Sequence, residues 1–288
     1  MKKCLPDFPA MLPHARTRFS LLAGLVVLST GCGEQALKNW RYDNLSTRKL
    51  QAASIVGLPE RPIAGKTFSE FFKDKVVLIG APGVPVPLGR GAPVAEDGYV
   101  LTAWHVVDRG SFLWSDTVLL KPLPKKSGPF KSSDYFRETK YPGRVVWHDE
   151  DVDLAIVKFD HRPSAILKAA KSPVERGTAV FSGAAGLNGG VLVGNSLDEG
   201  IGNGPFKTAG RVTKVRKDDG AIRRFIYQST LVARGGMSGS GVVDEKGRLV
   251  GIVTRIHARV FTPPATSFTM IDPESLERII RQDRVSHR

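Results

Sequence analysis

The sequence predicts an all-β fold of short antiparallel strands that close into barrels, followed by one C-terminal helix. From Val76 onward, short runs of β-branched and other apolar residues are separated by glycine and proline, which is typical of small barrels. Asp97 and Gly98 lie between two such runs, and both residue types tolerate the positive φ of a tight hairpin turn. Asp272 and Pro273 fit the cap and the first turn of the helix, which we expect at residues 273–283.

The expected strands fall into two groups of six. In the first group they lie at residues 75–80, 89–95, 99–103, 118–122, 140–148 and 154–159, with a basic surface loop at 122–139. In the second group they lie at residues 178–182, 205–216, 221–228, 241–243, 249–255 and 266–271. Residues 33–75 are polar and mixed, so we expect a tether and a segment that packs on the barrels, with short helices around 37–52 and 67–73.

The N-terminus has the pattern of a bacterial export signal. Lys3 and Arg16 precede an apolar run at 19–28, which is too short to span a bilayer and suits a signal-peptide core. Residues 28–32 read Leu-Ser-Thr-Gly-Cys and resemble a lipobox, although Ser29 stands where leucine is usual. We therefore expect a lipoprotein signal peptide at 1–31 and lipidation of Cys32, which would anchor the protein in the bacterial cell envelope, facing the periplasm or the exterior. An ordinary secretory signal with an incidental cysteine is the alternative.

Cysteine content and charge limit how the fold can be stabilised and which partners the protein can bind. Cys4 lies in the segment expected to be removed and Cys32 at the acylated terminus, so no intramolecular disulfide is expected and the core alone must hold the fold. The formal net charge of +14 favours anionic partners such as lipid headgroups, or simply a solvated basic surface.

Three segments carry candidate catalytic groups. Residues 101–107 read Leu-Thr-Ala-Trp-His-Val-Val, residues 151–157 read Asp-Val-Asp-Leu-Ala-Ile-Val, and residues 235–241 read Gly-Gly-Met-Ser-Gly-Ser-Gly. A serine hydroxyl is a poor nucleophile at neutral pH, so it needs a base within hydrogen-bond reach and a group that orients the base. A histidine, an aspartate and a serine in a glycine-rich turn supply these three groups, and together they indicate acyl transfer.

These motifs resemble those of the chymotrypsin-like (trypsin-like) serine protease family, in its bacterial disulfide-free branch with the high-temperature-requirement proteases and the glutamyl endopeptidases. The motifs that carry the resemblance are Thr-Ala-Trp-His, Asp-Leu-Ala-Ile-Val, Gly-Met-Ser-Gly-Ser-Gly and the segment 247–253, and they cover about residues 76–271. The resemblance implies two six-stranded antiparallel β-barrels with a C-terminal helix. The protease domain would span residues 76–288, with barrels at about 76–160 and 175–272, and residues 32–75 would form a tether and extension.

The resemblance also implies roles for individual residues. His105 would be the general base, Asp153 would orient its ring, and Ser238 would be the nucleophile. Asp151 competes with Asp153, which we prefer because it directly precedes Leu-Ala-Ile-Val. Ser240 competes with Ser238 in the same way, but only Ser238 matches the glycine spacing of the family.

Two backbone N–H groups of the glycine-rich turn would stabilise the developing oxyanion. The N–H groups of Gly236 and Ser238 are expected to form this oxyanion hole, which requires glycine at 236 so that its amide can point inward. Met237 stands where animal trypsins carry an aspartate that pairs with the newly cut N-terminus. Activation by that ion pair is therefore not expected here.

The specificity pocket is expected around five residues, by alignment to the family: Val232, Thr254, Arg255, Ile256 and Ser267. An aliphatic side chain at 232 disfavours a basic substrate residue, since a buried cation without a partner is costly. Small or medium apolar residues are expected instead. The guanidinium at 255 could pair with an acidic substrate residue or point to solvent.

The sequence contains no metal-ligand spacing, phosphate-cradling loop or nucleic-acid motif, so no cofactor, no metal and no specific nucleic acid are expected. The leading hypothesis is a secreted, lipid-anchored serine endopeptidase that acts on protein or peptide substrates. A binding or chaperone-like module with weak or absent turnover is the alternative. The interpretation as a nucleic-acid-binding protein would be supported by the net charge alone.

Overall fold

The computed structural model describes residues 49–82, 88–108, 117–122, 136–184, 206–257 and 265–287. The chain divides into two compact units, Met1–Asp43 and Asn44–Arg288, and all described residues belong to the second. The expected signal peptide and Cys32 lie outside the described residues.

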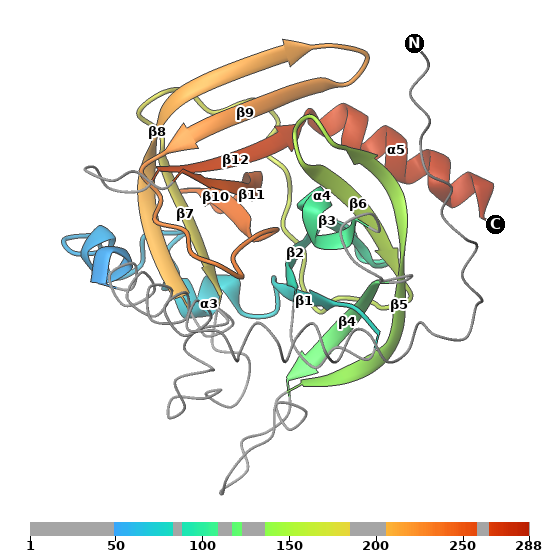
Figure 1. Ribbon diagram of the computed structural model, residues 1–288. Coiled ribbons are helices and arrows are strands. Elements are labelled where there is room, and N and C mark those ends of the chain that lie inside the picture. Colours follow the sequence, from blue (N-terminus) through green and yellow to red (C-terminus); the bar gives the residue numbers. More distant parts are fainter. Residues whose placement is uncertain are drawn as a thin grey trace, which may run out of the picture. The chain divides into compact units, whose positions relative to one another are not determined.

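The first barrel contains six antiparallel strands (Figure 1). They are β1 (Val77–Gly80), β2 (Gly89–Pro93), β3 (Tyr99–Thr102), β4 (Thr117–Pro122), β5 (Phe136–Asp149) and β6 (Leu154–Phe159). The sheet order is β1-β2-β3-β6-β5-β4, and β4 pairs back onto β1, which closes the barrel.

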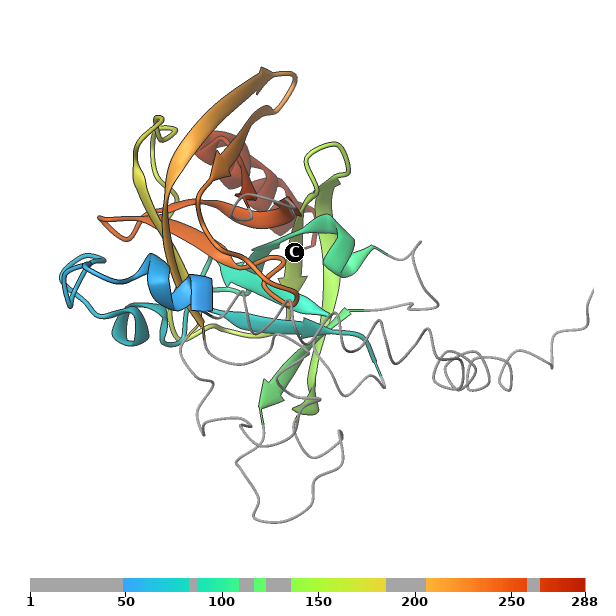
Figure 2. The same ribbon diagram turned by 60° about the vertical axis from the view of Figure 1, so that its left-hand side comes forward.

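The second barrel is built in the same way. Its strands are β7 (Ala179–Ala184), β8 (Phe206–Asp219), β9 (Arg223–Ser229), β10 (Gly241–Asp244), β11 (Leu249–His257) and β12 (Ala265–Ile271). The order is β10-β11-β12-β9-β8-β7, closed by pairing of β10 with β7. The β8–β9 hairpin extends beyond the rest of this barrel in both views (Figure 2). The predicted fold class is confirmed.

The alternation of side chains along β3 and β6 divides the core into two clusters. Val100 and Val157 pack inside the first barrel with Ile79, whereas the neighbouring Leu101 and Ile156 join the larger cluster that fills the second barrel. Successive strand residues point to opposite faces, so both faces of these two strands are buried. The strands therefore belong at once to the first barrel and to its junction with the second.

Three labelled helices accompany the barrels. In α3 (Phe68–Phe72), Thr67 and Glu70 form a reciprocal capping box, and Phe68 packs edge-on against Phe181 of β7. The predicted helix at 67–73 is thus confirmed. The short α4 (Trp104–Val107) directly follows the strand expected at 99–103, in a place where the sequence predicted no helix. None of the described helices is long and apolar enough to cross a membrane.

The C-terminal helix α5 (Pro273–Ser286) is capped by Asp272 as predicted and ends three residues later than expected. Asp283 fastens it to the first barrel by accepting two hydrogen bonds of 2.7 Å from Arg144 and one of 2.8 Å from the Tyr99 hydroxyl. The hydrogen bonds from Arg144 lower the pKa of Asp283. Burial, together with the adjacent carboxylate, raises the pKa of Tyr99 to about 12.

Candidate active site

His105 and Asp153 contact each other through both carboxylate oxygens. Asp153 Oδ2 lies 2.7 Å from His105 Nδ1, and Oδ1 accepts a 2.9 Å hydrogen bond from the backbone N–H of His105. The backbone carbonyl of Asp153 also accepts from the N–H of Trp104 at 3.2 Å. The imidazole ring of His105 is thereby held against the carboxylate. Its other nitrogen, Nε2, remains available to accept or donate a proton.

The backbone of Asp153 adopts a left-handed conformation, with φ of +55°. This conformation is uncommon outside glycine, and aspartate is among the residues that tolerate it. It occurs in the turn just before β6, where it allows both the carbonyl and the carboxylate to face the start of α4. The competing Asp151 is exposed and lies 3.5 Å from Arg224, so the structure brings Asp153 and not Asp151 to the histidine.

Trp104 stacks on His148 beside this pair, with ring centroids 3.9 Å apart and an interplanar angle of 12°. His148 lies on β5, so the stack joins the first residue of α4 to that strand. Sequence reasoning assigned no role to His148, because a contact across 44 positions leaves no local signal.

Two successive turns shape the loop that carries Ser238. Met237 N–H donates to Arg234 O at 3.1 Å, and Ser240 N–H donates to Met237 O at 2.9 Å. The third residues of these turns are Gly236 and Gly239, and each has φ of +81°. A turn with positive φ at its third position but not at its second is type II and favours glycine at the third position. The glycine spacing around Ser238 is thus a requirement of the backbone.

The loop is seated against the first barrel. Ser238 O accepts a 2.8 Å hydrogen bond from Arg90 N–H on β2. A Cβ on the neighbouring Gly89 would meet Ser238 O at 2.9 Å and Val106 at 2.6 Å, so both residues lie against the same glycine. Since Val106 follows His105, the structure brings the backbone of Ser238 to the end of α4 that carries the histidine. Ser240 is fully buried and cannot meet a substrate without rearrangement.

A buried arginine that sequence reasoning missed supports the same loop. Arg90 has no exposed surface, and its Nη1 donates to the carbonyl oxygen of Gly236, while its guanidinium lies 4.9 Å from the ring of Phe206. Burial and the nearby charge of Arg234 lower the pKa of Arg90 to about 9, so it stays protonated at neutral pH. The only sequence signal is an arginine between two glycines in an otherwise apolar strand.

The predicted pocket residues gather on β11, β12 and the loop before Ser238. Val232 is buried, and the adjacent Ala233 N–H donates to Thr266 Oγ1 on β12 at 3.1 Å. Thr254 Oγ1 lies 3.4 Å from Ser267 O, which joins the two strands at a bulge. Arg255 is exposed, and Ile256 lies on β11 opposite Thr266.

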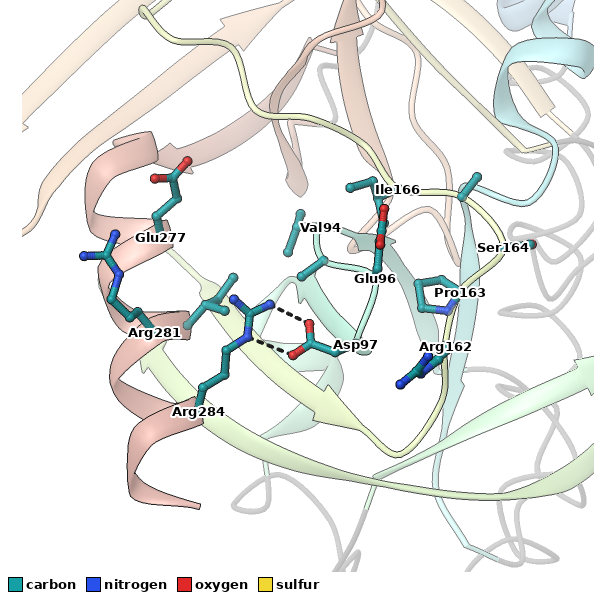
Figure 3. A pocket seen from close by; sticks show the side chains of 13 residues that line it. Val94, Glu96, Asp97, Arg162, Pro163, Ser164, Ile166, Glu277, Arg281 and Arg284 are labelled. Atoms are coloured by element: carbon teal, nitrogen blue, oxygen red, sulfur yellow. Dashed lines mark hydrogen bonds and ion pairs between the residues drawn. The ribbon is translucent and has the colours of Figure 1, made fainter. Parts of the chain in front are cut away.

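A separate pocket of about 840 Å³ lies beside α5 (Figure 3). It is lined by residues 94–97, residues 162–166 and the helix, and Arg284 pairs with Asp97 at its edge through bonds of 2.8 and 2.6 Å. None of His105, Asp153 and Ser238 lines this pocket. We therefore assign it no part in the chemistry.

Comparison with known proteins gives a family match and similar folds. The family model for the trypsin-like peptidase domain matches residues 89–252. The MamO protease domain from Magnetospirillum magneticum is 22% identical with a TM-score of 0.50, covering 72% of this chain and 97% of that one. The inactive form of the Rv3671c protease is 19% identical (TM-score 0.48; 78% and 98% covered). The HtrA-type protease AlgW with a decapeptide is 17% identical (TM-score 0.48; 79% and 66% covered). A search of curated proteins finds no match.

Proposed function

Because the chain belongs to the trypsin-like peptidase domain family, we propose that it is a serine endopeptidase with a Ser-His-Asp triad. The observation that best supports this proposal is the double contact of Asp153 with His105, beside a glycine turn that carries Ser238. A histidine held in this way keeps one tautomer, with the proton on Nδ1 and a free lone pair on Nε2. That is the state a general base requires.

The proposed reaction has two halves. Ser238 Oγ attacks the carbonyl carbon of the scissile bond while His105 Nε2 takes the hydroxyl proton, and Asp153 stabilises the resulting imidazolium. The N–H groups of Gly236 and Ser238 stabilise the negative oxygen of the tetrahedral intermediate. The imidazolium then protonates the leaving amine, the C–N bond breaks, and an acyl-enzyme remains. Water, deprotonated by the same histidine, attacks the ester carbonyl. The imidazolium then returns the proton to Ser238 Oγ as the acyl C–O bond breaks, and the carboxylic acid product leaves.

The proposal extends to substrate preference and location. The aliphatic side chain of Val232 favours small or medium apolar residues on the acyl side of the cleaved bond, because it offers no partner to a substrate cation. A signal sequence and an acylated Cys32 would place the enzyme in the bacterial envelope, where its substrates would be proteins or peptides. No cofactor or metal is needed for this chemistry.

The deciding experiment is labelling of the full chain with a serine-reactive phosphonate, followed by peptide mapping. We expect a single modified peptide that contains Ser238. Ser238→Ala should not be modified, and His105→Ala should not be modified at a measurable rate. Ser240→Ala is the matched control and should be labelled normally, since that side chain is buried. A folded wild-type chain that neither reacts nor hydrolyses peptides would favour the binding module over the enzyme.

A further inference from the structure

Gln51 connects the segment before the barrels to the loop that carries Ser238. Residues 49–54 are helical, and Gln51 is only 5% exposed. Its Nε2 donates to Val232 O at 2.8 Å and to Met237 Sδ at 3.2 Å. Both acceptors lie between β9 and β10, more than 180 positions away in the sequence. The two N–H bonds of one amide group are thus both directed at the same loop.

The helical segment is itself fixed to the second barrel. Ser54 Oγ donates to Gln51 O at 2.7 Å and accepts from the backbone N–H of Ala209 on β8 at 3.1 Å. On the adjacent residue, Thr208 Oγ1 accepts from Val232 N–H at 3.0 Å. The backbone N–H and C=O of Val232 are therefore both held, one by β8 and the other by Gln51. Gln51 is anchored firmly enough to position the loop.

Met237 transmits this contact to the reacting groups. It has no exposed surface, and its sulfur receives hydrogen bonds from Gln51 and, at 3.4 Å, from the backbone N–H of Arg234. Met237 lies between Gly236 and Ser238, whose N–H groups we assign to the oxyanion hole. The peptide plane that carries the N–H of Ser238 begins at Met237 Cα, so displacement of the methionine rotates this donor away from the oxyanion.

We propose that Gln51 is a positioning residue for the oxyanion hole, so that the segment before the barrels acts on the nucleophile loop through this one side chain instead of serving only as a tether. This inference rests on the proposed function. It gives the N-terminal extension a defined role, in which an amide and a thioether, both neutral, hold the residue next to the nucleophile. Removal of the chain through residue 54 should therefore inactivate an enzyme whose barrels are intact.

The test compares Gln51→Met with Lys49→Ala in the full chain. Methionine is unbranched and close to glutamine in length but has no N–H donor, whereas Lys49 is exposed on the same helical segment. We expect Gln51→Met to lower kcat for a peptide substrate by roughly 10- to 100-fold, with KM nearly unchanged, because the lost interaction acts on the transition state. The rate of phosphonate labelling at Ser238 should fall in parallel, and Lys49→Ala should match the wild type.

A merely structural role would lower Tm without lowering kcat in the folded fraction. Gln51→Met that is folded and has the wild-type kcat, or that raises KM alone, would overturn the inference. If Gln51→Met does not fold, Met237→Leu removes the sulfur acceptor from the other side, and wild-type kcat in that variant would overturn it equally. Wild-type protein that is not labelled at Ser238 would instead refute the proposed function, and this inference with it.

Discussion

Asp153 holds His105 at two points, the ring Nδ1 and the backbone N–H, with distances of 2.7 and 2.9 Å. The same carboxylate therefore determines both the tautomer of the ring and the position of the helix that carries it. The carboxylate of Asp151, two residues earlier, lies 3.5 Å from the guanidinium of Arg224.

This difference separates the two aspartates in a mutational test. Asp153→Asn should reduce kcat/KM by about 10⁴-fold, because an amide favours the wrong imidazole tautomer. Asp151→Asn is the matched control and should change kcat/KM by no more than about twofold, as expected for an exposed ion pair. Steady-state kinetics on a peptide substrate measures both, and the reverse order of effects would assign the orienting role to Asp151.

Gly239 cannot accept a side chain, and Gly235 can. A Cβ at 239 would lie 1.8 Å from Arg90 O and 2.4 Å from Thr102 Oγ1, at φ of +81°, whereas a Cβ at 235 meets nothing within 4 Å. Gly239→Ala should lower the free energy of unfolding by about 3 kcal/mol or more and abolish activity. Gly235→Ala should retain both. Denaturant unfolding with parallel activity assays checks the pair, and equal tolerance at both positions would contradict the described turn.

The anchor of α5 predicts a pH dependence of stability. The hydrogen bonds from Arg144 lower the pKa of Asp283 below its ordinary value of 3.8, so its contribution is complete above that pH and is lost as pH falls through the lowered pKa. Asp283→Asn should cost about 1–3 kcal/mol at pH 7, and the difference from wild type should shrink below about pH 4. Asp219→Asn, at an exposed pair, should have little effect. Urea unfolding at several pH values tests this prediction. If the loss of unfolding free energy in Asp283→Asn does not depend on pH, the charge of Asp283 does not contribute to stability.

The membrane anchor is tested at the N-terminus. We expect the mature wild-type protein to partition into detergent and to begin with an acylated Cys32 peptide. Cys32→Ala should move it to the aqueous phase, and Cys4→Ala should not, because Cys4 lies in the segment to be removed. Wild-type protein found wholly in the aqueous phase, with a free N-terminus elsewhere, would refute the anchor.

We expect the aliphatic side chain of Val232 to determine cleavage specificity. A peptide library should show cleavage after small or medium apolar residues, because a substrate cation would lose its hydration and gain no partner. Val232→Asp should shift the profile toward Lys and Arg. A wild-type profile dominated by Lys or Arg would contradict the assignment, and one dominated by Asp or Glu would give Arg255 a role in substrate binding.

The positions of most strands and their division into two groups could be predicted because the pattern of apolar runs and turn residues is local, and the family resemblance implied the two barrels. The ends of two strands could not. Strand β5 begins at Phe136, inside the segment expected to be a loop, and β8 continues to Asp219. In β8, residues 213–217 are exposed on both faces, so they show none of the alternation that indicates a half-buried strand.

The site residues with motifs were predictable, and the residues that hold them were not. Arg90 violates the hydrophobic pattern, since its charge is buried against a carbonyl oxygen and an aromatic ring that sequence alone does not bring near. Gln51 is one polar residue in a polar segment, and its two partners lie at the other end of the chain. Such contacts depend on tertiary structure and have no periodicity.

The hydrogen bond from Arg90 N–H to Ser238 O crosses from one barrel to the other. His105 and Asp153 belong to the first barrel and Ser238 to the second, and each barrel closes its own ring of strands. A chain divided between β6 and β7 would give two fragments, each with a complete sheet and neither with all three groups. Under the proposed function, hydrolysis would return only when the two fragments reassociate, and the rate of hydrolysis would then report contact between the two halves of the chain.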